Sequence, residues 1–470
     1  MKGMGNKMKK VQPDAEGVPY EALCRFFEAL DAMPFDIHSV VMLRHGNVVL
    51  ETYYEPCKPY SLHRMFSVTK SFVGLAVGCL AAENKIDLDS PICSYFPEYT
   101  PSHEYIKQTT VRNMLMMRSP HDKTTYKADL SGDWVGSFFT TLPSHMPGTV
   151  FAYDTSASHV LGALVEKITG MPFLDYLRKS FLDEIGFSKD AYCLKDPQGV
   201  SVGGSGLMAR TMDLARVAQF VMNGGKWDGK QLMDGDFLLE ATSFLSRTDV
   251  RGSFADEKQG YGMQFWRTHN NGFMLYGIGG QLALCLPEKD FILVTTADTL
   301  GCQGGVQAIL DIFWHEVYTR LDTPSRCGKD TLERLLQNRH IQPVRGSTNK
   351  TDAEYVFEEN KLGLSKIHVI SDENGGSIEY TNNTGSHALK FRTDGFYSGN
   401  FPYYECPCIT SGAWDGKNIL TIKSRLIGEM VGSVTMELYF TDGAVTVSSR
   451  KTEGTFFNEF NGIAQGKRVK

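Results

Sequence analysis

The sequence predicts an α+β domain, built from an antiparallel sheet with flanking helices and a helical lobe beside it, followed by a small all-β barrel. Strand-like patterns stand at both ends of the first domain, around residues 40–50 and 276–297, and the long stretch between them is helical and irregular. From residue 355 onward, short alternating segments recur with turns between them, which is typical of a small barrel. A chain of 470 residues is also too long for one ordinary hydrophobic core.

The N-terminal elements follow from local patterns. Residues 1–20 are expected to form a flexible tail, because untethered chain ends rarely become ordered. Apolar side chains then recur at helical spacing over residues 20–33, which predicts a helix. The next segment, residues 40–50, reads as two central strands joined at the turn His45-Gly46-Asn47.

The C-terminal half of the chain divides into three parts. Residues 282–297 predict two buried strands and residues 305–321 predict a closing helix, so the first domain is placed at residues 21–323. Residues 324–350 change in composition and are expected to be a linker that contains one short helix. Residues 351–470 form the predicted barrel and carry no catalytic constellation.

Composition and charge exclude several classes of protein. The apolar fraction of 42% and the charged fraction of 22% are ordinary for a globular chain. A net charge of −6 without a long basic stripe argues against a nucleic-acid partner. No apolar run is long and continuous enough to span a bilayer, which argues against a membrane protein. The lysine-bearing N-terminus lacks the apolar core of a signal peptide, so the chain is expected to be cytoplasmic.

Cysteine and histidine usage gives no sign of a metal. The ten cysteines are expected to be reduced thiols, because the sequence shows no secretion signal. Cys406 and Cys408 are close in sequence, but one C-x-C without a second pair is a poor zinc site, and the twelve histidines show no ligand spacing. The sequence therefore predicts neither a metal nor another cofactor.

The tetrad Ser67-Val68-Thr69-Lys70 is the first candidate for chemistry. It begins a strongly apolar run, residues 72–82, that reads as a buried helix. Residues three apart on a helix lie on the same face, so the serine hydroxyl and the lysine amine are expected to be close together. Desolvation favours the neutral amine, which can accept the serine proton. The tetrad alone is a weak signal, because S-x-x-K occurs by chance in many chains.

Three further segments accompany the tetrad in order along the chain. Tyr153 precedes a second apolar helix that ends at Gly170, and a glycine-rich stretch, Gly203-Gly204-Ser205-Gly206, leads into a third. The segment from Tyr276 to Gln281 opens the two late strands. Ser205 is a poor rival nucleophile, because Leu207 stands where a G-x-S-x-G elbow needs its second glycine.

Together these segments resemble the serine β-lactamase and penicillin-binding-protein superfamily, specifically its class C-like esterase and peptidase branch. The resemblance covers roughly Phe35 to Trp314 and includes the flanking segments 85–91 and 261–266. It implies the α+β fold described above. Some relatives carry a lipocalin-like appendage similar to residues 351–470, whose expected roles here are lining the active-site mouth or self-association. The oligomeric state stays open.

The resemblance also implies residue roles. Ser67 would be the nucleophile that forms an acyl-enzyme, Lys70 would share its proton, and Tyr153 would pass a proton between the serine and the leaving group. The backbone amides of Ser67 and Gln281 would form the oxyanion hole. The sequence leaves open whether Lys70 or Tyr153 acts as the general base, because the protonation states of two interacting groups are coupled.

Two departures from the family pattern bear on the substrate. Thr155 stands where the second motif usually has asparagine, and it can serve either as a substrate contact or as a helix N-cap. Ile278 stands where the third motif usually has lysine or histidine, a group that helps to hold a substrate carboxylate. Gly279 and Gly280 would let a substrate approach the strand closely. The loss of the basic group favours neutral esters or amides over β-lactams.

These residues favour a serine hydrolase that cleaves a small ester or amide through an acyl-enzyme. Two alternatives remain: a D-amino-acid peptidase or weak β-lactamase, and a non-catalytic binding protein that retains the pocket. His63 and Arg64 are expected to be a surface pair. The aromatic residues Tyr126, Trp134 and Phe151 are expected to pack in the core rather than to recognise substrate.

Overall fold

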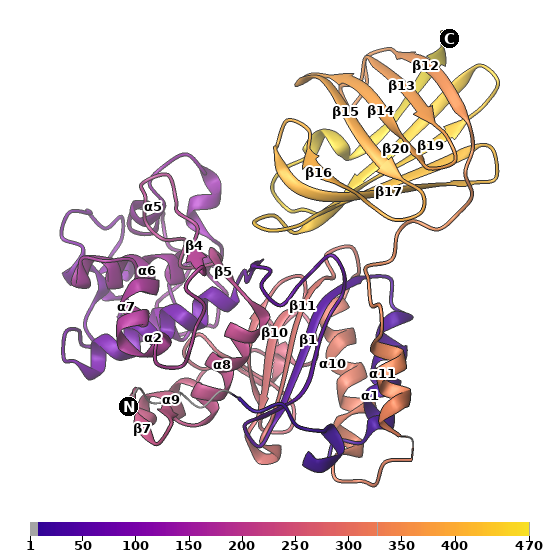
Figure 1. Cartoon of the computed structure of the whole chain (residues 1–470). Coiled ribbons are helices and arrows are strands. Elements are labelled where there is room, and N and C mark those ends of the chain that lie inside the picture. Colours follow the sequence, from indigo (N-terminus) through magenta and orange to yellow (C-terminus); the bar gives the residue numbers. More distant parts are fainter. Residues whose placement is uncertain (1–7, 327, 470) are drawn as a thin grey trace. The chain divides into compact units, whose positions relative to one another are not determined.

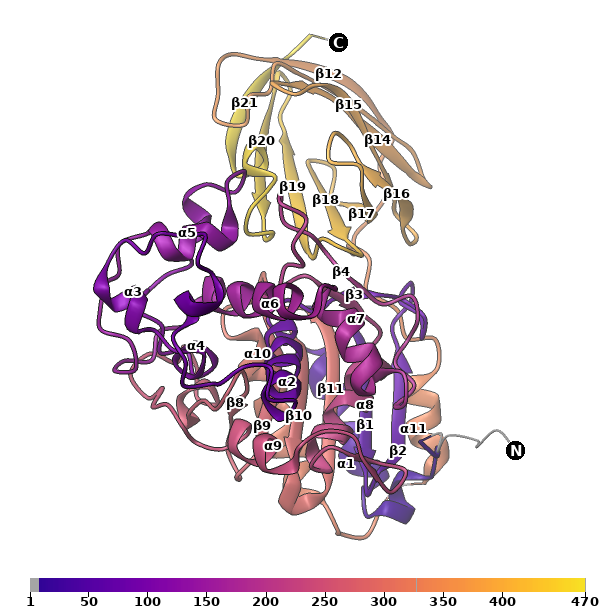
Figure 2. The same cartoon turned by 90° about the vertical axis from the view of Figure 1, so that its left-hand side faces the viewer.

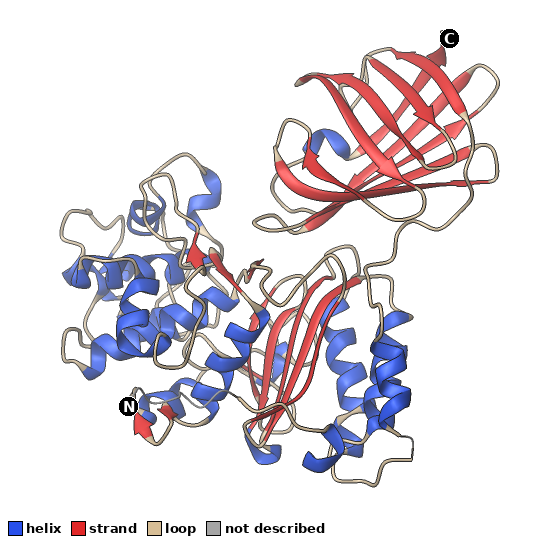
Figure 3. Cartoon of the chain, in the orientation of Figure 1, coloured by secondary structure: helices blue, strands red, loops and turns tan. Residues whose placement is uncertain are grey.

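The computed structural model describes residues 8–326 and 328–469, which form two compact units (Figure 1). The first comprises the chain up to residue 297 together with residues 304–339, and the second comprises residues 298–303 and the chain from residue 340 onward. The first unit combines helices with an antiparallel sheet, and the second is a β-barrel (Figure 3). The fold class predicted from the sequence is confirmed.

A six-stranded sheet forms the centre of the first unit, with its strands in the order β2-β1-β11-β10-β9-β8. The pairs β1–β2, β8–β9, β9–β10 and β10–β11 are antiparallel. The N-terminal hairpin therefore lies beside the last strand of the unit, and both ends of its sequence meet in one sheet. The strands are β1 (Asp36–Arg44), β2 (Asn47–Tyr53), β8 (Trp266–Arg267), β9 (Phe273–Gly277), β10 (Gln281–Leu286) and β11 (Phe291–Asp298).

Helices cover both faces of this sheet (Figure 1). On one face α1 contacts α10 and α11, and on the other α8 contacts β1 and β10. The bounds are α1 (Tyr20–Asp31), α8 (Thr211–Met222), α10 (Gly305–Glu316) and α11 (Lys329–Leu336). Within the described residues, no helix combines the length and the apolar character needed to cross a bilayer.

The helical lobe is built around α2 (Val68–Ala82), which is buried on every side from Val68 to Leu80. A helix that is apolar all round lies in the interior of a protein, and α2 contacts α6, α7 and β9. The lobe also contains α3 (Glu104–Gln108), α4 (Val111–Leu115), α5 (Trp134–Thr140), α6 (Thr155–Thr169), α7 (Phe173–Leu177) and α9 (Gly235–Ala241).

Small strands and short helical turns complete the first unit. A three-stranded sheet has the order β3-β5-β4, and β6 pairs with β7. The strands are β3 (His63–Arg64), β4 (Tyr192–Cys193), β5 (Leu207–Ala209), β6 (Lys226–Trp227) and β7 (Lys230–Gln231). The short turns are 3-10 helices at Pro13–Glu16, Ile92–Tyr95, Thr125–Ala128, Glu257–Gln259, Pro287–Lys289 and Tyr318–Arg320, and a π-helical turn at Arg178–Leu182.

Part of the expected N-terminal tail contacts the first unit. The Val11 amide donates to the Val48 carbonyl at 3.1 Å, and the Val48 amide donates to the Lys9 carbonyl at 2.8 Å. Val18 is fully buried. Residues 1–7 of the expected tail lie outside the described part of the chain.

The second unit is a barrel of short antiparallel strands (Figure 2). A parallel bridge between Arg392 of β15 and Ser411 of β17 closes nine strands into a ring, and β16 pairs antiparallel with β17. Inward-facing apolar side chains such as Ile367, Val369, Ile422 and Leu438 fill the interior. The strands are β12 (Thr351–Phe357), β13 (Lys366–Ser371), β14 (Gly375–Asn382), β15 (Gly385–Arg392), β16 (Tyr397–Phe401), β17 (Cys406–Asp415), β18 (Ile419–Leu426), β19 (Gly432–Phe440), β20 (Ala444–Lys451) and β21 (Gly462–Arg468), with a 3-10 turn at Asn458–Phe460.

Candidate active site

Ser67 and Lys70 lie side by side at the start of α2. The Lys70 Nζ donates a hydrogen bond to the Ser67 Oγ at 2.9 Å and another to the Gly204 carbonyl at 2.7 Å. Lys70 is 1% exposed. Burial lowers the pKa of Lys70 to about 7, and the Asp154 carboxylate opposes that shift. With a pKa in this range, a substantial fraction of the amine is neutral near pH 7, whereas a solvated lysine stays protonated.

The backbone around Ser67 is fixed by residues on both sides of it. Phe66 adopts a positive φ of 43°, a strained conformation for a bulky residue, and strain of this kind persists where the surroundings enforce it. The Met65 amide donates to the Leu207 carbonyl at 2.8 Å. The Thr69 Oγ1 donates to the Phe66 carbonyl at 2.6 Å and accepts from the Leu207 amide at 3.0 Å. The serine is therefore held on a rigid turn at a helix N-terminus.

Tyr153 is the third polar group at this position. The Lys70 Nζ lies 4.9 Å from the centroid of the Tyr153 ring. Burial raises the pKa of Tyr153 above its ordinary value, and a hydrogen bond with the Ser67 side chain partly offsets that rise. The ring stacks on Trp266 at 5.4 Å and meets Tyr261 edge-on at 6.3 Å. The phenol is thus kept neutral and is held by aromatic neighbours.

Asp154, rather than Thr155, caps helix α6. The Asp154 carboxylate accepts from the Ser156 amide at 2.9 Å and from the Ser119 hydroxyl at 3.0 Å. Thr155 is the first residue of α6, and it packs against Gly204, the residue whose carbonyl accepts from Lys70. Of the two roles that the sequence left open for Thr155, the capping role belongs to its neighbour.

Gly203 and Gly204 let their loop approach α6 closely. A Cβ on Gly203 would lie 2.9 Å from the Ser158 carbonyl oxygen and 3.3 Å from the Gly162 Cα, both of them backbone atoms that cannot rotate away. This close approach brings the Gly204 carbonyl within hydrogen-bond distance of the Lys70 amine.

We expect Gly203→Ala to lower both the stability and the activity of the protein. The added methyl group forces the loop away from α6, which costs about 1–3 kcal/mol of unfolding free energy. Displacement of the Gly204 carbonyl should reduce kcat/KM by roughly tenfold, an activation cost of about 1.4 kcal/mol. Thermal melts and turnover kinetics measure both effects. Gly454→Ala is the control, because a Cβ there meets nothing within 4 Å; equal behaviour of the two variants would contradict the prediction.

The turn between β9 and β10 lies against the Ser67 backbone. A Cβ on Gly277 would lie 3.1 Å from the Ser67 amide nitrogen, and Gly277 is the ladder partner of Gln281. Gln281 is 1% exposed, and its side-chain amide donates to the Ala297 carbonyl at 2.8 Å. The sequence-predicted oxyanion residues Ser67 and Gln281 thus belong to segments that meet at Gly277.

Ile278, Gly279 and Gly280 form this turn. Gly279 and Gly280 have φ angles of 82° and 92°, values that glycine adopts without strain. The Thr295 hydroxyl donates to the Gly280 carbonyl at 2.8 Å and fixes the turn. The Ile278 side chain is 48% exposed, so an apolar group stands at the position where the family usually has a cation.

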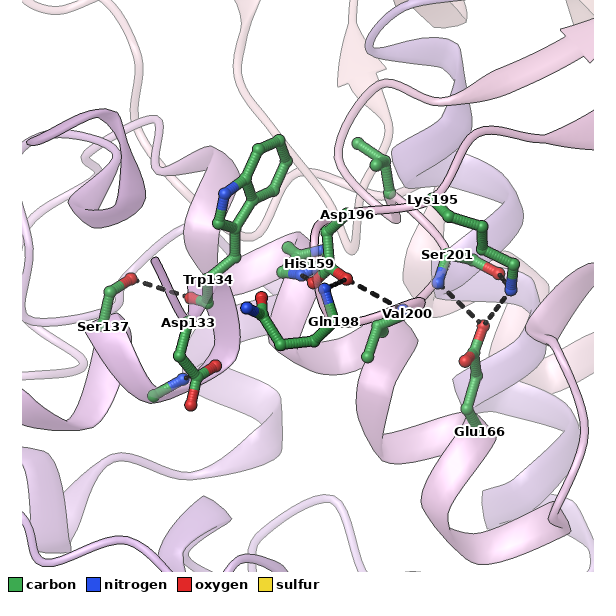
Figure 4. Close-up of polar contacts among 12 residues, drawn as sticks. Asp133, Trp134, Ser137, His159, Glu166, Lys195, Asp196, Gln198, Val200 and Ser201 are labelled. Carbon is green, nitrogen blue, oxygen red and sulfur yellow. Dashed lines mark hydrogen bonds and ion pairs between the residues drawn. The ribbon is translucent and has the colours of Figure 1, made fainter. Parts of the chain in front are cut away.

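The aromatic residues of the lobe form a packed cluster. Tyr126 and Trp134 stack with centroids 4.1 Å apart, and both rings meet the edge of His159. The His159 Nε2 lies 3.0 Å from the Asp196 carboxylate, and both side chains are fully buried (Figure 4). The carboxylate also accepts from the Val200 amide at 2.8 Å. Tyr126 is buried in this cluster and Trp134 is half-buried, whereas Phe151 is buried elsewhere, against Tyr261 and Trp266. The buried histidine–aspartate pair was not predicted, because the two residues meet only in the tertiary structure.

His63 and Arg64, which the sequence predicts to be a surface pair, are placed differently in the structure. His63 is 7% exposed and does not lie on the surface, so its expected place in a surface pair is wrong. Pairing of β3 with β5 draws His63 into the interior opposite Ala209. Arg64 is half-buried, and its Nε donates to the Ser205 carbonyl at 3.2 Å while the guanidinium lies over the Phe66 ring.

Comparison with known proteins places this arrangement among hydrolases. The model of the family described as Beta-lactamase matches residues 38–303. The chain is 27% identical over 303 residues to 6-aminohexanoate-dimer hydrolase of Paenarthrobacter ureafaciens, and the alignment covers 58% of this chain and 76% of that protein.

Solved structures share the fold. EstCE1, described as a hydrolase with promiscuous acyltransferase activity, is 17% identical with a TM-score of 0.51 and covers 63% of this chain and 99% of its own. The structure of SurE with D-Leu is 15% identical with a TM-score of 0.52 and covers 87% of this chain and 97% of its own. The similarity to SurE therefore extends beyond residues 38–303.

Proposed function

The chain belongs to the β-lactamase family, and from that premise we propose that it cleaves a small ester or amide through an acyl-enzyme on Ser67. The 2.9 Å contact between the Ser67 hydroxyl and a buried Lys70 carries this proposal. A nucleophilic serine needs an adjacent base that is neutral at working pH, and burial lowers the pKa of Lys70 to about 7.

The residues would act in sequence on the carbonyl of the substrate. Neutral Lys70 accepts the Ser67 proton while the Oγ attacks the carbonyl carbon. The backbone amides of Ser67 and Gln281 stabilise the resulting oxyanion. Tyr153, whose pKa is raised by burial, donates a proton to the leaving oxygen or nitrogen. A water molecule then releases the acyl group by the reverse proton route.

Neutral substrates are the better fit to this site. Ile278 is exposed and apolar where a cation would hold a substrate carboxylate. The Paenarthrobacter relative is named for hydrolysis of a 6-aminohexanoate dimer, a linear amide that also carries a carboxylate, so its name supports an amide bond rather than a neutral substrate; EstCE1 is described as a hydrolase. Linear amides and short esters are therefore proposed ahead of β-lactams and D-peptides.

Intact mass after exposure to a fluorophosphonate, followed by peptide mapping, tests the acyl-enzyme directly. A single adduct on Ser67 supports the proposal and justifies a screen of p-nitrophenyl esters, the 6-aminohexanoate dimer, a chromogenic cephalosporin and a D-Ala-terminal peptide. An unmodified, folded protein would favour the alternative of a non-catalytic binding protein. An adduct on Ser205 instead would mean that the nucleophile is misassigned.

We expect Ile278→Lys to shift selectivity toward substrates that carry a carboxylate. An ammonium group at this exposed position adds one charge-assisted contact, which should raise kcat/KM for such a substrate relative to its neutral methyl ester by roughly tenfold. Ile278→Val keeps the site apolar and is the control. A selectivity ratio that is the same in both variants would show that position 278 does not face the substrate.

A further inference from the structure

Three buried side chains with metal-ligating atoms meet near the start of β1. His38 lies on β1, Cys57 in the connection after β2, and His63 on β3. One ligand atom from each residue, two ring nitrogens and the Cys57 Sγ, all lie within 4.8 Å of one another. The imidazole rings stack with centroids 5.3 Å apart. None of the three side chains belongs to the proposed hydrolytic machinery.

Backbone hydrogen bonds fix all three positions. The Tyr54 amide donates to the His38 carbonyl at 2.9 Å, and the Cys57 amide donates to the Tyr54 carbonyl at 2.8 Å. His63 is held opposite Ala209 by the pairing of β3 with β5. The backbone of the fold therefore holds the three side chains close together. Rotation of the side chains alone would bring their ligand atoms to a shared ion.

We propose that His38, Cys57 and His63 bind one divalent zinc ion or a similar borderline cation. A thiolate with two imidazoles is a donor set that selects zinc or cobalt over calcium or magnesium, which prefer oxygen. Zinc–sulfur and zinc–nitrogen bonds of ordinary length separate tetrahedral ligand atoms by about 3.5 Å, so the three atoms need to move by only about an ångström. The fourth position would be taken by water.

The surroundings are suited to a cation. Binding of the ion would displace the Cys57 proton into solvent, and the resulting thiolate would neutralise one of the two positive charges of the ion. The carboxylates of Asp36 and Glu55 lie close enough to interact electrostatically with Cys57. His63 is on the segment that leads into Ser67, so the ion would tie that segment to β1. Its role would be structural, and no step of hydrolysis passes through it.

Cobalt titration of the full-length, chelator-treated protein tests the site. Co²⁺ bound to a thiolate gives a ligand-to-metal charge-transfer band in the near ultraviolet, and a tetrahedral ion gives strong visible bands. We expect one equivalent per chain, displaced by Zn²⁺, with a rise in melting temperature on zinc addition. Cys57→Ala should remove the charge-transfer band and weaken cobalt binding by at least about tenfold. Cys24→Ala, which removes another buried thiol, should leave both unchanged.

The results that would overturn the metal-site proposal do not depend on the hydrolase activity. The absence of a charge-transfer band in wild type at excess Co²⁺ would overturn the proposal, as would a full band in Cys57→Ala. If Cys57→Ala does not fold, His63→Gln replaces it, with the same loss of affinity expected. Cobalt binding by His63→Gln equal to that of wild type would place the metal elsewhere.

Discussion

Replacing Ser67 with alanine is expected to lower kcat by at least about 10⁴-fold and to leave the protein folded. Loss of the nucleophile in a serine hydrolase removes the acyl-enzyme route, and single replacements of this kind cost roughly 10⁴–10⁶ in turnover. Ser67 occupies the N-cap position of α2, but its side chain makes no capping hydrogen bond. The helix therefore loses little, and the unfolding free energy should change by less than about 1 kcal/mol.

Ester hydrolysis, fluorophosphonate labelling and a thermal melt measure these effects together. Ser205→Ala is the matched control, because Ser205 lies on the adjacent loop and should keep both the activity and the adduct on Ser67. Turnover in Ser67→Ala within tenfold of wild type would mean that another group performs the chemistry.

Replacing Lys70 with methionine is expected to lower kcat/KM by about 10²–10⁴-fold, the range that general-base catalysis contributes. Methionine preserves the length and the burial of the side chain but cannot accept a proton. For wild type we expect kcat/KM to rise with pH and to level off above about pH 7, because burial lowers the pKa of Lys70 to about 7 and only the neutral amine is active. The variant should lack this rise.

A pH series from about 5 to 9 with a neutral ester separates the two proteins. Lys70→Arg serves as the second variant, because arginine stays charged throughout this range and should be as inactive as the methionine variant. A wild-type profile that is flat across neutral pH, or an unchanged rise in Lys70→Met, would remove Lys70 from the role of base.

The parts of the molecule that the sequence predicts are those encoded locally. The hairpin at His45-Gly46-Asn47 and the late strand pair within 282–297 follow from turn residues and alternation, and they are observed as β1–β2 and β10–β11. The predicted central position is wrong for β2, which is the outermost strand of the sheet, because order within a sheet depends on long-range pairing. The contact between Ser67 and Lys70 follows from helical spacing, since residues three apart share a face.

The remaining features depend on tertiary packing and leave no local pattern. The Gly204 carbonyl reaches Lys70 only because a distant loop packs against α6. His38, Cys57 and His63 come from two strands and a loop at spacings that match no metal motif. The roles of Lys70, Tyr153 and Gln281 in catalysis stay predictions until the variants are measured.

The order of the central sheet has a consequence for synthesis on the ribosome. The β1–β2 hairpin is made first, yet its neighbour β11 emerges only after the whole helical lobe has been translated. Until then the inner edge of β1 presents unpaired backbone groups, a template for wrong pairing. Most neighbours in the barrel are consecutive hairpins, so its pairing is local and should be fast. We infer that completion of the central sheet, rather than the barrel, limits the yield of folded protein.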